Sequence, residues 1–216
     1  MTQNSVNNSA SEFTVDPGAA TDSYIQYNKS SAAKWRTGND ATDDSYRISQ
    51  GSALGTNDTI IATTTGQITF PLQYKFLAYV PSNLNNQTGN GTSTTVVFGT
   101  EVFDIGGGYN NSTGVFTAPV AGKYLFTVNV LLDAVGAGHT SGELGFITTG
   151  FGYYASQCSP AAMRNSGNRV ALHASIYVDM AATDTCSILP VVYNSTKTVG
   201  YFGGQTYTWF SGCLIN

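Results

Sequence analysis

The two histidines are the side chains best suited to acid–base catalysis, yet neither stands in a catalytic motif. His139 lies in the Gly-rich segment 136–142, and His173 shares a face of an expected strand with Tyr177. No carboxylate or nucleophile accompanies either histidine at a recognisable spacing, so a catalytic triad or a zinc site has no support. The sequence therefore predicts no catalytic residue, no bound metal and no cofactor.

The three cysteines, Cys158, Cys186 and Cys213, do not follow the spacing of a metal site. Cys186 and Cys213 have apolar neighbours in expected strands. We interpret both as buried small hydrophobic residues, in preference to a disulfide pair.

Acidic residues and one glycine run offer three further kinds of site. Asp40, Asp43 and Asp44 could hold a cation, but their spacing lacks the alternation of a calcium loop, which favours a solvated turn. A retaining glycosidase needs paired carboxylates on neighbouring strands, whereas most of the 13 acidic residues fall in polar segments. The glycines at 106–108 lack the lysine and the helix of a phosphate loop, so a tight strand connection is expected. We expect the protein not to be an enzyme.

Composition narrows the class of protein. Charged residues make up 10% of the 216 residues, and Gly, Tyr and Phe are abundant, as is typical of strands joined by many turns. A net charge of -4 argues against nucleic-acid binding, because phosphate neutralisation needs a basic face. No apolar run approaches membrane-spanning length. Residues 1–18 lack the basic and apolar regions of a signal peptide, so we expect assembly in a host cytoplasm.

The stretch from Tyr109 to Val130 shows which elements must position any site. A turn cluster at 110–114 precedes a short strand at 115–117, which ends before Pro119. From Gly122 a long strand begins, and alternate residues give it one apolar face: Tyr124, Phe126, Val128, Val130 and Leu132. A strand, a tight turn and a strand with one apolar face indicate a half-buried antiparallel sheet.

This stretch also carries a resemblance to a known family. The pattern Gly114, Phe116, Pro119, Gly122, Tyr124 and Phe126 resembles the core motif of the complement component one-q head domain, a jelly-roll relative of tumour necrosis factor. The segments 76–79 and 97–105 resemble the strands before that motif. The run 207–215, with Phe210 and Gly212, resembles the closing strand. The resemblance implies an all-β antiparallel jelly-roll sandwich over residues 71–216.

Upstream of the expected jelly roll the chain divides into two parts. Residues 1–20 are polar, and we interpret them as a docking arm, with a disordered tail as the alternative. Residues 21–70 contain short strand candidates separated by Gly, Asn, Asp and Ser, which indicates a small β-rich attachment module. Because few large apolar side chains occur there, the module is expected to lean on copies of itself or on the next domain. Its layout resembles modules found before the tip domains of phage and algal-virus fibres.

The last expected strand indicates self-association. Its two faces, one with Trp209, Cys213 and Ile215 and the other with Phe210 and Leu214, are both largely apolar. One face can fill the sandwich core, and the other needs a cover. In the resembled family two further subunits supply that cover, so these five residues are the candidates for a homotrimer interface.

Together these features predict a non-enzymatic homotrimeric protein on a virion surface: a spike, a short fibre tip or a capsid decoration. The N-terminal region would dock on a capsid or tail protein, and the head would project outward toward a host-surface glycan or protein. No residue is assigned to receptor binding. A secreted trimeric recognition ligand of the complement and tumour-necrosis-factor type is the alternative, and a glycan-cleaving fibre tip is the third hypothesis.

Overall fold

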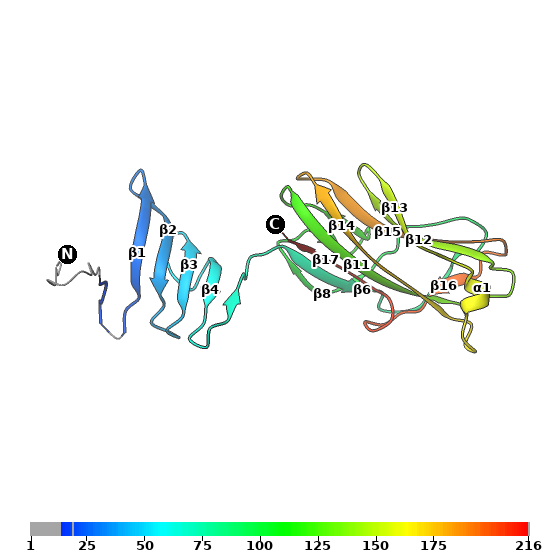
Figure 1. The fold of residues 1–216 in the computed structure, drawn as a ribbon, viewed down its shortest axis with the longest axis horizontal. Helices are drawn as coiled ribbons and strands as arrows, with labels where there is room; N and C mark the ends of the chain where they lie inside the picture. Colours follow the sequence, from blue (N-terminus) through cyan, green and yellow to red (C-terminus); the bar gives the residue numbers. More distant parts are fainter. Residues whose placement is uncertain (1–13, 19, 216) are drawn as a thin grey trace, which may run out of the picture. The chain divides into compact units, whose positions relative to one another are not determined.

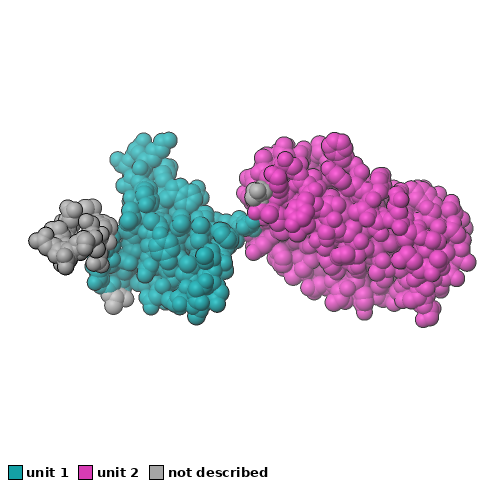
Figure 2. All heavy atoms as spheres, in the orientation of Figure 1, with its two compact units in different colours: residues 1–73 teal, residues 74–216 magenta. Residues whose placement is uncertain are grey.

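The computed structural model describes residues 14–18 and 20–215 of the chain. Contacts within the chain divide it into two compact units, residues 1–73 and residues 74–216 (Figure 2). The expected docking arm lies largely outside the described residues, which include only positions 14–18 and 20 of it. In the described part of the chain, no helix is long and apolar enough to cross a membrane.

Unit 1 is a single antiparallel sheet in which each strand pairs with its neighbour in sequence (Figure 1). Its strands are β1 (Ser23–Lys29), β2 (Ala32–Asn39), β3 (Tyr46–Gln50), β4 (Asp58–Ala62) and β5 (Ile68–Thr69). All five lie within residues 21–70, where the turn residues predict short strands. At the first hairpin Ser30 and Ser31 both have positive φ, 51° and 63°, which is the backbone that a tight two-residue turn requires.

Unit 2 is a sandwich of two antiparallel sheets, which confirms the expected all-β jelly roll. One sheet has the order β13-β12-β15-β10-β9, with bounds β9 (Tyr109–Asn110), β10 (Val115–Thr117), β12 (Ser141–Thr148), β13 (Gly152–Cys158) and β15 (Thr185–Tyr193). The other has the order β7-β16-β11-β17-β6-β8, with β14 on the free side of β11. Its bounds are β6 (Lys75–Tyr79), β7 (Leu84–Thr88), β8 (Thr100–Ile105), β11 (Gly122–Asp133), β14 (Val170–Met180), β16 (Val199–Tyr201) and β17 (Trp209–Leu214).

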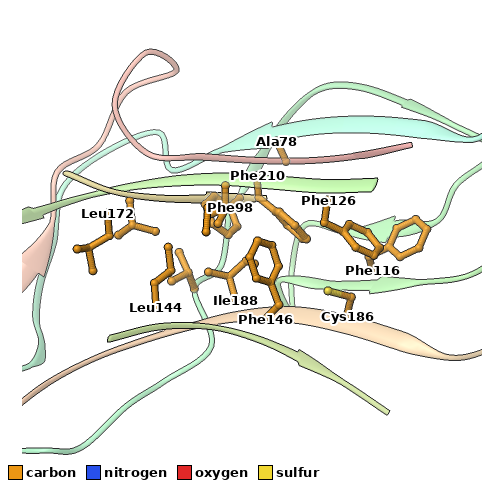
Figure 3. Close-up of a cluster of buried hydrophobic side chains, with 14 of the residues drawn as sticks. Ala78, Phe98, Phe116, Phe126, Leu144, Phe146, Leu172, Cys186, Ile188 and Phe210 are labelled. Atoms are coloured by element: carbon orange, nitrogen blue, oxygen red, sulfur yellow. The ribbon is translucent and has the colours of Figure 1, made fainter. Parts of the chain in front are cut away.

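Strand β11 lies at the centre of the second sheet because it pairs with β14 on one side and with β17 and β16 on the other. Its alternate residues all point into the sandwich with no exposed surface, as the period of two predicts: Tyr124, Phe126, Val128, Val130 and Leu132. Figure 3 shows Phe126 and Phe210 from this sheet facing Phe146, Ile188 and Cys186 from the other. The core is therefore built from both inner faces.

Aromatic rings dominate one part of this core. Phe76 stacks on Tyr109 at 4.8 Å and on Phe116 at 5.2 Å between ring centroids, and it meets Phe210 edge-on at 4.9 Å. Gly212 lies beneath them, since a Cβ at this position would come within 2.6 Å of the Phe76 ring. At the two signature positions, Phe210 supplies a large ring, and Gly212 leaves the space that the neighbouring Phe76 and Phe126 rings occupy.

Two segments without an alternating apolar pattern contain regular structure. Within residues 83–95, β7 pairs with β16, because backbone hydrogen bonding forms this strand without an alternating apolar pattern. Within residues 159–168, a single turn of helix α1 (Pro160–Met163) follows Ser159. The glycines at 106–108 connect β8 and β9, as expected, and the Asp104 carboxylate accepts a hydrogen bond from the Tyr109 N–H at 3.0 Å.

Candidate functional site

The outward side of the larger sheet is the first candidate site, and we call it the outer face. Cross-strand pairing puts on it the residues that alternate with the core positions: Leu77 and Tyr79 on β6, Phe103 on β8, Leu125, Thr127, Asn129 and Leu131 on β11, His173, Ser175 and Tyr177 on β14, and Trp209, Ser211 and Cys213 on β17. In the described part of unit 2, no second sheet covers this side, and the loop residues 205–207 reach it beside Asn129 and Trp209.

Several polar side chains of the outer face already have hydrogen-bond partners, while some of its aromatic side chains remain exposed. Thr127 and Ser175 share a hydrogen bond of 3.0 Å between their hydroxyls, and the Asn129 amide donates to the Tyr207 carbonyl. By contrast, the Tyr177 side chain is 70% exposed and Phe103 is 41% exposed. A shallow groove of about 460 Å³ runs beside Leu77, Phe103 and Trp209. Exposed apolar side chains gathered on one side of a sheet mark a candidate interaction site.

The five residues expected at a trimer interface lie on two different sides of the sheet. Trp209 and Cys213 lie on the outer face, and Ile215 follows with 45% of its surface exposed. Phe210 has no exposed surface and Leu214 packs against the core, because the period of two turns both inward. Phe210 therefore belongs to the core, and Leu214 is partly buried on the same side of the strand.

Sequence reasoning missed much of the outer face. Leu125 and Leu131 alternate with the core residues of β11. Two leucines on the second side of this strand could have indicated that this side also contacts a partner. Tyr177 and Phe103 could not be assigned, because only the register places Tyr177 beside Leu125 and Phe103 beside Leu77.

Loops gathered at one end of unit 2 form the second candidate site, and we call residues 83–95, 134–140, 159–169 and 194–208 the apical loops. Hydrogen bonds join them: Ser195 N–H to Gly89 O at 3.0 Å and Ala161 N–H to His139 O at 2.8 Å. The chain enters and leaves unit 2 at the opposite end, where the Leu214 N–H donates to Tyr74 O at 2.9 Å. Figure 1 shows α1 and the C-terminus at these two ends.

The apical loops offer hydrogen-bonding groups and little charge. Arg164, Arg169 and Lys197 are their only charged residues, and Asn, Thr, Ser and Gly make up most of the remainder. Amide and hydroxyl groups in this density can bind sugar hydroxyls or exposed peptide groups.

His139 holds the apical loops together and does no chemistry. Its Nδ1 accepts a hydrogen bond from the Gly136 N–H at 2.8 Å, so its Nε2 carries the proton and donates to Thr196 O at 3.0 Å. The ring is 1% exposed. Both nitrogens are thus engaged, which leaves no position for a metal or a substrate proton.

The acidic cluster of unit 1 differs from the solvated turn that its spacing suggested. Arg47 lies among three carboxylates, with Nη1 at 2.5 Å from Asp58, Nη2 at 2.7 Å from Asp43 and Nε at 3.2 Å from Asp40. Asp40 and Asp58 have side chains only 6% exposed. The guanidinium therefore takes the place that a cation would occupy, and only Asp43 and Asp44 remain solvated.

Hydrogen bonds and charge favour the ionised forms of Asp40 and Asp43. The Thr42 hydroxyl and N–H, followed by Arg47, hold the pKa of Asp40 below its usual value. The Ser45 hydroxyl and N–H, followed by Arg47, do the same for the pKa of Asp43. Among the residues that the structure describes, no group of three or more His, Cys, Asp or Glu is arranged to hold a metal ion.

The cysteines are free thiols. Cys186 is fully buried in the core, as expected, and this burial raises the pKa of its thiol. Cys158 and Cys213 are half-buried, and burial also raises their pKa values. None of the three thiols is activated as a nucleophile.

A family model describes the C1q domain, and it matches residues 78–215. The chain belongs to the C1q domain family. Two solved structures are similar to it: the globular domain of zebrafish complement 1qA, with 17% identity and a TM-score of 0.47, and murine APRIL at pH 8.5, with 12% identity and a TM-score of 0.46. They cover 67% and 66% of this chain, and 98% and 99% of their own chains. Among curated proteins, none matches the chain.

C1q domains are generally non-enzymatic ligands or structural proteins, and they typically form homotrimers. The signature residues of the C1q domain here are structural. Gly114 has φ +76°, and a Cβ there would collide with the Val96 carbonyl. Phe116, Tyr124 and Phe126 pack in the core, and the Tyr124 hydroxyl donates to Val120 O at 2.8 Å in the turn after Pro119. Gly122 opens β11.

Proposed function

We propose that the chain is a non-enzymatic homotrimeric surface protein of a virus particle. Its outer faces meet around a threefold axis, and its N-terminal region docks on a capsid or tail protein. The apical loops then project outward to contact a glycan or protein on the host surface.

The apolar side chains of the outer face are the observation that supports the homotrimer. Trp209, Tyr177, Leu125 and Leu131 stand on one side of a sheet whose other side already fills the core. Burying one such side chain is worth about 1.5–3 kcal/mol, so leaving a whole face in water is costly. Two further copies of the chain supply a matching apolar cover, as C1q domains typically do.

The positions of the chain ends support the outward orientation of the loops. Unit 2 is entered at Tyr74, at the end opposite to the apical loops. A chain held on a particle through its N-terminal region therefore keeps these loops free for binding. Their amide and hydroxyl groups suit a glycan, whose hydroxyls both donate and accept hydrogen bonds.

A matched pair of variants tests the trimer. Leu125→Asp puts a charge on the outer face between Tyr177 and Cys213, while Ala155→Asp puts one on an exposed position of the other sheet. We expect the first variant to be monomeric by light scattering and the second to keep three chains. Equal masses for the two variants would contradict the use of this face.

The particle location is tested by fractionation of the producing culture. Antibodies against the head should find the protein in gradient fractions that contain particles, and in proportion to the capsid protein. Recovery only as free trimers in the surrounding medium would instead support the secreted-ligand hypothesis.

A further inference from the structure

Unit 1 is a sheet with its polar side covered and its apolar side bare. Loops 40–45 and 51–57 meet on one side, where Arg47 binds the buried Asp40 and Asp58 and the Gly55 N–H donates to Asp58 at 3.0 Å. The opposite side, which we call the bare face, collects through cross-strand pairing the residues Ile25, Tyr27, Trp35, Tyr46, Ile48, Ile60, Ala62 and Ile68. An ordinary half-buried sheet has the reverse arrangement.

No described element of unit 1 packs on the bare face. Ile68 is 64% exposed, Tyr27 53%, Tyr46 46%, Ile25 44% and Trp35 40%. Leu54 is the one buried apolar side chain among the described residues of this unit, and it lies on the other side. A single-layer sheet of this size cannot supply its own hydrophobic core, so the bare face needs a partner.

We infer that the bare faces of three copies close on one another to form a three-sided prism with a shared apolar interior. The inference rests on the trimer proposed above. It assigns to unit 1 a second threefold interface, separate from the outer face of unit 2, and makes the attachment module a part that folds only as an assembly.

The dimensions of the sheet favour an assembly of three copies over one of four. Five strands about 4.8 Å apart are separated by four intervals and span roughly 19 Å, and strands of five to eight residues are about as long. A triangle with sides of roughly 19 Å puts each sheet about 5.5 Å from the axis, near the ~5 Å of side chain that one sheet contributes in an ordinary sandwich. Four copies would put each sheet about 10 Å away and leave a hollow centre.

Three modules can close into the prism because the unit 2 trimer holds them at a high local concentration. The bare face exposes on the order of 500 Å² of apolar side chain, less than the ~800 Å² per partner of a stable interface. Isolated modules would therefore associate weakly. The short segment 70–73 ties each module to a unit 2 trimer, and a short flexible tether raises the effective concentration to about the millimolar range.

Oxidative footprinting of the unmodified full-length protein, together with its molar mass, tests the inference. We expect a trimer in which hydroxyl radicals spare Tyr27 and Trp35 but modify Phe151, which is 71% exposed in unit 2. A trimer whose Trp35 is oxidised as fast as Phe151 overturns the prism and leaves the proposed function standing. A monomer overturns both.

A second matched pair of variants tests whether the bare face is covered by other copies of the chain or by a different partner. Ile60 lies on the bare face, and its neighbour Ile61 lies on the covered side, cross-strand from Arg47. In the full-length trimer, Ile60→Asp should abolish hydrogen-exchange protection of β1–β4 and expose Trp35, while Ile61→Asp should preserve both. Equal protection in the two variants would overturn the inference, because a charge on a bare, unshared face costs little.

Discussion

Replacing Arg47 with methionine should unfold unit 1 while leaving unit 2 intact. The guanidinium is the only partner of opposite charge for Asp40 and Asp58 among the described residues, and both carboxylates are buried. Methionine keeps most of the side-chain volume but leaves two buried charges uncompensated. Breaking a buried ion pair in this way costs about 3–5 kcal/mol. A sheet of this size with one buried leucine has little stability in reserve.

Arg36→Met is the matched control in the same sheet. Arg36 lies 3.9 Å above the Tyr24 ring and donates to the Gln26 side chain at 2.8 Å, in an exposed setting. Contacts of this kind contribute about 0.5–1 kcal/mol. A loss of 3 kcal/mol corresponds to more than a hundredfold change in an opening equilibrium.

Hydrogen-exchange mass spectrometry of the full-length protein separates the two variants. Peptides from β2 to β4 should lose their protection in Arg47→Met and keep it in Arg36→Met, while peptides from β11 change in neither. If Arg47→Met loses no more protection than Arg36→Met, the ion cluster is not what holds unit 1 together.

Three further predictions concern pH, packing and the apical loops. The pKa values of Asp40 and Asp43 are lowered in the folded state, so their contribution to stability is present above the unfolded value near 4 and is lost as the pH falls below it; unit 1 should therefore lose exchange protection on acidification, and a pH-independent unit 1 would contradict this. Gly212→Ala should lower stability by about 1–3 kcal/mol in a thermal or denaturant melt, since its Cβ would press on two core rings; an unchanged melt would contradict the packing. His139→Ala removes a buried ring and its hydrogen bonds to the Gly136 N–H and the Thr196 carbonyl, at about 0.5–1.5 kcal/mol for each bond, and should raise proteolysis within the apical loops before any other part of unit 2.

Much of the sandwich could be predicted because its strands alternate. The buried positions of β11 and β14 follow directly from the period of two, and the motif from Gly114 to Phe126 carries the jelly roll. Strand β7 has the sequence LNNQT, and only its pairing with β16 makes it a strand, so no local pattern could reveal it.

The sites were less predictable because they depend on register. Phe210 and Trp209 are adjacent aromatic residues, and only the packed sheet shows that the first is core and the second is outer face. Arg47 and Asp58 are separated by 11 residues, and the pairing of β3 with β4 brings them together. The bare face of unit 1 likewise appears only once five strands are in register.

The molar mass of the full-length protein in dilute solution tests the central claim most directly. Each chain has a mass of 22.8 kDa, and we predict a species of three times that mass that persists on dilution into the nanomolar range. A species of one chain at micromolar concentration would contradict the outer face as a threefold interface, and with it the proposed surface protein.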